Sequence, residues 1–167
     1  AYAYVTDAYN VDQGLSVVDV SDPAHPVAVG HYVTPCVGGG LAVAGDYVYL
    51  AGPLKGLEVI SVNDPAKPAL IGRYPGVGGS GSAGVAVSGP LACVAGDAAG
   101  LLLFDVTTPT NLVLRSTMNT GGQTLGCCIV GRWAYVADNK TGLQIIDVSD
   151  PDHPGTVGSC PITPVYS

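Results

Sequence analysis

Short apolar runs separated by turn residues make up the chain, and no segment has a sustained helical period. One run recurs with the pattern Gly-Leu-x-apolar-apolar-x-apolar and ends each time at a proline. Its four copies are residues 14–23, 56–65, 100–109 and 142–151, and they start 42, 44 and 42 residues apart. Proline has no amide hydrogen to donate to a sheet, so each copy predicts a strand that stops at its proline.

Each repeat holds further strand candidates around this recurring strand, which we call strand C. Strand A is predicted at 41–44, 85–88 and 127–130, and a glycine follows each copy. Strand B is predicted at 2–6, 47–51, 91–95 and 133–137, and strand D at 26–33, 68–74, 112–118 and 154–160. The A–B connections, such as Gly45-Asp46, have the two-residue hairpin form.

Four short antiparallel strands in about 42 residues are the dimensions of a propeller blade. The sequence therefore predicts an all-β fold, a β-propeller of four blade-like repeats in a single domain over 1–167. The expected repeats are 1–38, 39–80, 81–122 and 123–160, followed by a tail at 161–167. Strands A and C are nearly continuous apolar runs, so both faces of each sheet are expected to be buried.

The first repeat lacks its innermost strand, because the chain begins at strand B. Three interpretations stay open. The tail at 163–166 supplies a short strand A and closes a four-bladed ring, or the chain is an excerpt of a larger propeller. In the third, a neighbouring molecule adds a strand to the unpaired edge at 2–6. A chain that opens at Ala1 is expected to be a processed product or a fragment.

The repeated segment resembles the LVIVD repeat. The closest matches are Leu15-Ser-Val-Val-Asp19 and Leu143-Gln-Ile-Ile-Asp147, whereas Ser61 and Thr108 depart from aspartates of the pattern. The resemblance covers essentially the whole chain. It implies a β-propeller from bacterial or archaeal cell-surface or secreted proteins, and it brings no shared catalytic motif.

The charge pattern argues against several kinds of partner. The formal net charge is −7, and the six basic residues are scattered singly. Nucleic-acid binding and attachment to anionic membranes both need clustered lysines and arginines. No apolar run reaches the length of a membrane span. Neither a nucleic-acid partner nor a membrane span is expected.

Three aspartates, Asp19, Asp105 and Asp147, recur near the end of strand C. An enzyme uses one or two unique acids, whereas a turn repeated in every blade uses one acid per repeat. We interpret these as structural turn acids that accept hydrogen bonds from turn amides. No catalytic, cofactor-binding or metal-binding residues are assigned. Asp7 and Asp12 are too few for a calcium site.

Other candidates have structural interpretations as well. His25 and His153 occupy a turn position that is Lys67 or Asn111 in the other repeats, which indicates a solvated loop. The aromatic pairs of strand B, such as Tyr47 and Tyr49, are expected to pack between blades rather than form a ligand platform. The Gly-rich stretch at 77–84 lacks the lysine of a phosphate-binding loop and is interpreted as a connection.

The cysteines number five and show no metal-ligand spacing: Cys36, Cys93, Cys127, Cys128 and Cys160. Cys127 and Cys128 are expected to be buried thiols on opposite faces of one strand. A disulfide between Cys36 and Cys160 requires that the ring closes.

Asn139-Lys-Thr141 is a glycosylation sequon in one of the variable B–C loops, so Asn139 is a candidate glycan site. Variable loops on a constant scaffold are also where binding would reside.

The function expected from these features is a non-enzymatic structural or adhesive repeat module at the cell surface or outside the cell. It would assemble through its incomplete blade, with copies of itself, other surface proteins or glycans as partners. The alternatives are a propeller hydrolase or lyase, and a sugar- or peptide-binding receptor, each with its site at the channel mouth.

Overall fold

The computed structural model describes residues 1–7, 14–34, 39–52, 56–76 and 84–162. Within those ranges the chain forms strands and no helix, and so no helix that could cross a membrane. The strands are β1 (Tyr2–Asp7), β2 (Gly14–Asp19), β3 (Val27–Val33), β4 (Gly40–Ala44), β5 (Tyr47–Gly52), β6 (Gly56–Ser61), β7 (Ala69–Tyr74), β8 (Val85–Ser88), β9 (Leu91–Ala95), β10 (Leu101–Asp105), β11 (Val113–Met118), β12 (Thr124–Val130), β13 (Trp133–Asp138), β14 (Gly142–Asp147) and β15 (Gly155–Cys160).

These strands form four antiparallel sheets, each made of strands consecutive in the chain: β1–β3, β4–β7, β8–β11 and β12–β15. The predicted all-β propeller architecture is confirmed, and within the described ranges the first sheet has three strands and no strand A. The tail at 163–166, proposed above as a short strand A, lies outside the described residues. The predicted strands agree closely with the observed ones. The largest differences are in strand C, which ends four residues before its proline, at Asp19, Ser61, Asp105 and Asp147, and in β12, which begins at Thr124 rather than at residue 127.

The hairpins between strands A and B depend on glycine. Gly45, Gly89 and Gly131 have φ angles of 58°, 55° and 60°. This left-handed conformation costs glycine little, because glycine has no Cβ to clash with the neighbouring backbone. The repeated glycine after strand A therefore fixes the turn that pairs β4 with β5, β8 with β9 and β12 with β13.

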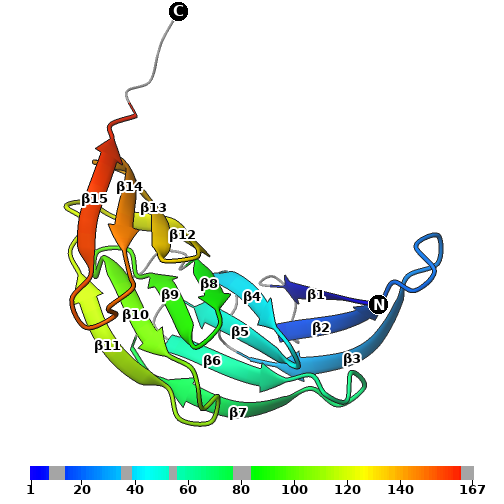
Figure 1. Ribbon diagram of the computed structural model, residues 1–167. Coiled ribbons are helices and arrows are strands. Elements are labelled where there is room, and N and C mark those ends of the chain that lie inside the picture. Colours follow the sequence, from blue (N-terminus) through cyan, green and yellow to red (C-terminus); the bar gives the residue numbers. More distant parts are fainter. Residues whose placement is uncertain (8–13, 35–38, 53–55, 77–83, 163–167) are drawn as a thin grey trace, which may run out of the picture.

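The four sheets follow one another along an open arc (Figure 1). Strands β4, β8 and β12 line the inner side of the arc, and β3, β7, β11 and β15 lie along its outer side. The first sheet stands at one end and the fourth sheet at the other (Figure 1).

Apolar cores lie between neighbouring sheets. We call the side of a sheet that faces the next sheet its front face and the opposite side its back face. Leu15 and Val17 on the front of the first sheet pack with Val48, Leu50 and Ile60 on the back of the second.

The other two junctions repeat this arrangement. Leu57 and Val59 pack with Val94 and Phe104, and Leu101 and Leu103 pack with Val136 and Ile146.

The prediction that both faces of every sheet are buried is wrong for the two end sheets. Val5, on the back of the first sheet, is 50% exposed, whereas its counterparts Leu50, Val94 and Val136 are 0% exposed. Val130, on the front of the fourth sheet, is 61% exposed. The physical reason is the open arc, which leaves one face of each end sheet without a neighbour.

Strand D carries a recurrent irregularity that positions the junctions. The register between strands C and D shifts at the same place in all four sheets, after Val17, Val59, Leu103 and Ile145. Such a bulge bends the strand and re-aims the residues beside it. The residue after the bulge is Gly30, Gly72 or Ser116 in the first three sheets, and there the C–D turn of the next sheet approaches.

Contacts at these positions are close. A Cβ on Gly30 would lie 2.0 Å from the carbonyl oxygen of Pro65, and one on Gly72 would lie 2.1 Å from that of Pro109. The hydroxyl of Ser116 donates a 2.6 Å hydrogen bond to the carbonyl of Pro151. Each junction therefore seats a proline carbonyl against strand D of the preceding sheet.

Candidate functional site

The recurring acids accept hydrogen bonds from the turns that follow strand C. The Oδ1 atom of Asp19 accepts from the amide of Ser21 at 2.9 Å, and Asp105 accepts from the amide of Thr107 at 2.9 Å. Asp147 accepts from the amide of Ser149 at 3.0 Å. Because an ionised carboxylate is the better acceptor, these bonds favour the charged form.

The pKa values of these acids follow from the same contacts. The side chain and amide of Ser21 lower the pKa of Asp19, and those of Thr107 lower that of Asp105. Arg132, which forms an ion pair with Asp147, is the main cause of the lowered pKa of that carboxyl. A carboxylate held in its charged form by a turn is a poor general acid at neutral pH.

A second group of polar side chains, which the sequence reasoning missed, lies between the first and second sheets. Glu58 in β6 is fully buried, and its carboxylate accepts hydrogen bonds from Thr34, at the end of β3, and from Arg73 in β7. The Arg73 Nε atom lies 2.9 Å from Glu58 Oε1. The side chain of Arg73 is about half exposed, so this charge pair reaches from the core to solvent.

A larger buried polar group lies between the third and fourth sheets. The hydroxyl of Thr120 contacts Thr124 Oγ1 at 2.8 Å and donates to Asp138 Oδ2 at 2.7 Å. Gln144 donates to the carbonyl of Thr120 at 2.5 Å. Burial raises the pKa of Asp138, but bonds from Thr141, Thr120 and Lys140 outweigh it and leave the pKa lowered.

Asp97 joins this group from the B–C turn of the third sheet. Its φ angle is 55°, and its amide and carbonyl pair with the carbonyl and amide of Thr124, at 3.2 and 3.1 Å. Aspartate tolerates the left-handed conformation better than most residues. The third sheet thus extends a short β-bridge to the strand that begins the fourth.

Both buried groups link neighbouring sheets. Among the described residues, no buried side-chain nitrogen or oxygen lacks a hydrogen-bond partner. In each group a threonine at the end of strand D bonds to a strand C residue 24 positions later, Thr34 to Glu58 and Thr120 to Gln144. At the corresponding positions, the junction between the second and third sheets has Gly76 and Leu102. That equal spacing was the signal in the sequence that could have revealed the two groups.

The inner side of the arc is poor in groups for acid–base chemistry. The strands there read Gly-Leu-Ala-Val-Ala in β4, Val-Ala-Val-Ser in β8 and Thr-Leu-Gly-Cys-Cys-Ile-Val in β12. None of these three strands contains a carboxylate, a histidine or a basic residue. In the described ranges, no group of three or more histidine, cysteine or acidic side chains could hold a metal ion. Asp7 ends β1, and Asp12 lies outside the described residues.

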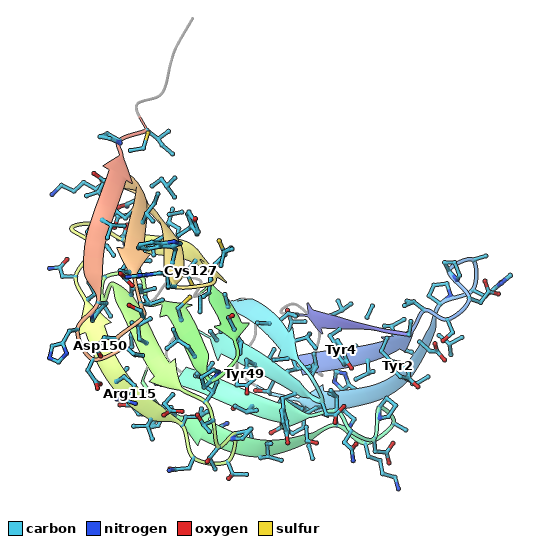
Figure 2. All side chains as sticks on the ribbon, viewed as in Figure 1. Tyr2, Tyr4, Tyr49, Arg115, Cys127 and Asp150 are labelled. Carbon is cyan, nitrogen blue, oxygen red and sulfur yellow. The ribbon has the colours of Figure 1, made fainter. Side chains whose placement is uncertain are left out.

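The histidines and Arg115 lie in the exposed turns and outer strands. His25 Nδ1 is 2.8 Å from Asp22 Oδ2, and His153 Nδ1 is 3.0 Å from Asp150 Oδ2. Arg115 in β11 donates from Nε to Asp152 of the next sheet at 2.8 Å. Figure 2 places Arg115 and Asp150 on the outer side of the arc, away from β4, β8 and β12.

The aromatic pairs of strand B differ in burial along the arc. Tyr49 is buried in the core between the second and third sheets, and Tyr4 packs against the core of the first junction (Figure 2). Tyr2 is exposed, and Tyr135 on the front of the fourth sheet is only partly buried. Tyr4, Tyr47 and Tyr49 therefore pack between sheets, whereas Tyr2 is exposed although it lies on the same face as Tyr4.

The cysteines correct one expectation. Cys93 is buried and Cys127 is half-buried, but Cys128 is exposed, so the prediction that Cys128 is buried is wrong. It lies on the front face of β12, where no further sheet covers it. Cys160 is also exposed, and these four thiols are free. Cys36, its proposed pairing with Cys160, and most of the Gly-rich stretch lie outside the described residues.

Asn139 lies exposed in the turn between β13 and β14. Its Oδ1 accepts from the amide of Gln123 at 2.9 Å, and its Nδ2 donates to Gln123 Oε1 at 2.7 Å. The nitrogen that a glycan would occupy is thus accessible from solvent and engaged in one side-chain bond.

Of the four B–C loops, the structure describes those at 96–99 and 138–141 in full. The loops at 7–13 and 52–55 lie mostly outside the described residues, so the structure gives no view of a binding site there.

Comparison with known families agrees with the repeat architecture. A family model described as the LVIVD repeat matches residues 1–34, 39–75, 79–120 and 121–161. Comparison with curated proteins found no match. The four matched segments correspond to the four sheets and cover most of the chain, and the chain therefore belongs to the LVIVD-repeat family.

Proposed function

We propose that this chain is a non-enzymatic structural or adhesive repeat module that works outside the cell or on its surface. The observation that carries the proposal is the use of its acids. The repeated aspartates are bonded to turn amides, and the inner strands β4, β8 and β12 carry no ionised side chain. The acidic side chains thus stabilise turns that recur from blade to blade. This use of the acids favours a scaffold over a hydrolase or lyase.

Association with further copies, other surface proteins or glycans is part of this proposal. Strand β1 is the edge of its sheet and, among the described residues, pairs only with β2. An unpaired strand edge invites strand addition. Asn139 would carry a glycan in a glycosylating pathway.

The experiment replaces Asp19, Asp105 and Asp147 with alanine one at a time. Each variant is assayed for its free energy of unfolding and for hydrolysis of chromogenic esters, glycosides and phosphates. A scaffold loses stability in all three variants and never exceeds the buffer rate. Turnover by the native chain that a single substitution abolishes, without an equal loss of stability, would overturn the proposal in favour of an enzyme.

A further inference from the structure

The fourth sheet repeats the features that receive a neighbour in the other three. The register between β14 and β15 shifts after Ile145, as it does at the equivalent residue in the other three sheets. The residue that follows this bulge in β15 is Gly158. Among the described residues, a Cβ at Gly158 would meet only Ile145 Cδ1 of its own sheet, at 3.9 Å. The position that a proline carbonyl occupies in the other sheets is therefore formed here, and no described residue fills it.

The first sheet presents the matching turn. Its C–D turn reads Pro23-Ala-His-Pro26, and the turn that contacts Gly30 from the second sheet reads Pro65-Ala-Lys-Pro68. At Gly30 an added Cβ would meet both Pro65 and Pro68 of that turn, at 2.0 and 3.1 Å. The strand D residues agree too, since Val29-Gly30 in β3 corresponds to Val157-Gly158 in β15.

The apolar faces agree in the same way. The front of the fourth sheet offers Tyr135, Leu143 and Ile145, the counterparts of Tyr4, Leu15 and Val17. The back of the first sheet offers Val5 and Val18, the counterparts of Leu50 and Ile60. Both sets are partly uncovered here, whereas Leu15, Val17, Leu50 and Ile60 form the buried core of the first junction and Tyr4 packs against it.

We propose that the front face of β12–β15 binds the back face of β1–β3 of a second copy of this chain. Pro23 of the second copy is seated on Gly158, in the manner that the first two sheets already show. The proposal rests on the proposed scaffold function and names the partner and the surface through which it assembles.

Two copies arranged in this way close a ring. A head-to-tail contact generates a ring when its rotation closes, and two arcs of four sheets give eight, within the range of about four to eight blades known for propellers. Each ring then contains the contact twice. Formation of the first contact raises the effective concentration for the second, so the closed pair is favoured over an open chain.

The test compares two glycines of β15. No atom of the described residues lies within 4 Å of a Cβ added at Gly155, whose counterparts are Val27, Ala69 and Val113. The Gly158→Val change places a side chain where the Pro23 carbonyl is expected, and Gly155→Val is the matched control. Neither residue touches a neighbour that would hinder folding of the single copy.

Sedimentation over about 1–100 µM, a range set by typical weak to moderate affinities, is expected to give twice the 16.7 kDa mass for the native chain. Gly158→Val is expected to raise the dissociation constant by about a hundredfold or more, from overpacking at both contacts. Gly155→Val is expected to leave it unchanged. Gly158→Ser is expected to retain the pair, because Ser116 donates to Pro151 at the same position.

A mixing experiment establishes the polarity. Val5→Glu places a charge on the apolar back face of the first sheet, and Gly158→Val places a side chain that blocks the front face of the fourth sheet. Each variant alone is expected to be monomeric. An equal mixture of the two is expected to associate through the one contact in which both faces are unchanged. Alkylation of the exposed Cys128 offers a second readout, since its rate is expected to fall as the pair forms.

If the native chain is monomeric over the whole concentration range, the inference is overturned, whether the arc stays open or closes on itself. A pair that Gly158→Val does not weaken overturns it as well, because association then uses another surface. Either result leaves the scaffold proposal intact, which fails only if the chain shows turnover.

Discussion

Thr34, at the end of β3, donates a hydrogen bond to the fully buried carboxylate of Glu58 in the next sheet. Arg73 holds the other oxygen of that carboxylate. The bond between Thr34 and Glu58 links the first sheet to the second. Removal of the Glu58 carboxylate leaves the buried Thr34 hydroxyl without this acceptor.

We therefore expect Glu58→Ala to lower the free energy of unfolding by about 1.5–3 kcal/mol, the usual contribution of a hydrogen bond to a charged group. Ser16→Ala is the matched control, since Ser16 occupies the same strand position on the uncovered back of the first sheet. Its expected effect is within about 0.5 kcal/mol. Urea unfolding measures both, and equal effects would contradict a tethering role for Glu58.

The turn acids predict a loss of stability in acid. The pKa values of Asp19, Asp105 and Asp147 are lowered in the folded chain. The stabilisation that they give is complete above the unfolded pKa of about 3.9 and is lost as pH falls through the lower folded pKa. Urea midpoints between pH 2 and 7 are expected to fall on the acid side of about pH 4.

The Asp147→Asn variant isolates one acid. The asparagine oxygen still accepts from the Ser149 amide but does not titrate, so the stability of this variant is expected to depend less steeply on pH in the acid range. Curves for the variant and the native chain that run parallel would show that Asp147 contributes nothing to the acid transition.

Thiol reactivity is expected to depend on how far the neighbouring sheets bury each cysteine. A hydrogen bond with Cys127, together with burial, raises the pKa of Cys93 well above its usual range. Since the thiolate is the reactive form, iodoacetamide at pH 8 is expected to modify Cys128 and Cys160 in the folded, unpaired chain and Cys93 only in urea. Labelling is carried out on the Gly158→Val variant, which keeps the chain monomeric. Peptide mass mapping reads each site, and equal rates at Cys93 and Cys160 would contradict this account.

Glycosylation at Asn139 is expected when the chain is secreted from a eukaryotic host, detected as a mass increase that Asn139→Gln and Thr141→Ala both remove. Because Asn139 Nδ2 donates to Gln123 Oε1, Gln123→Ala is expected to raise the fraction of chains that carry glycan. An unmodified secreted chain, with no gain in the Gln123 variant, would argue against the site.

The sheets were predictable because the signals that define them are local. The prolines after strand C, the glycines of the A–B hairpins and the period of about 42 residues all act within one repeat. The bulge at Val29 and its counterparts was not predicted, although a glycine follows it in three of the four repeats, at Gly30, Gly72 and Gly158, and an isolated glycine within a strand suggests a bulge.

The candidate site was less predictable than the fold. Asp19, Asp105 and Asp147 repeat at one register, so their turn bonds could be anticipated. Glu58 and Asp138 occur once each, and their partners lie in other strands or in the neighbouring sheet. Cys128 aligns with the small, partly buried Ala42 and Ala86, but cover at that position depends on a neighbouring sheet that the fourth sheet lacks in this structure.

The order of the strands bears on how the chain folds during synthesis. Every ladder joins strands that follow one another in the sequence, so each sheet is complete once its own last strand has left the ribosome. Contacts at short sequence separation form quickly, and nascent chains commonly fold from the N-terminus onward. A nascent chain that has emerged to Tyr74 already holds both sides of the first junction, including Thr34 and Glu58. Each later sheet can then pack against a sheet that has already folded, so the order of translation sets the order in which the sheets assemble.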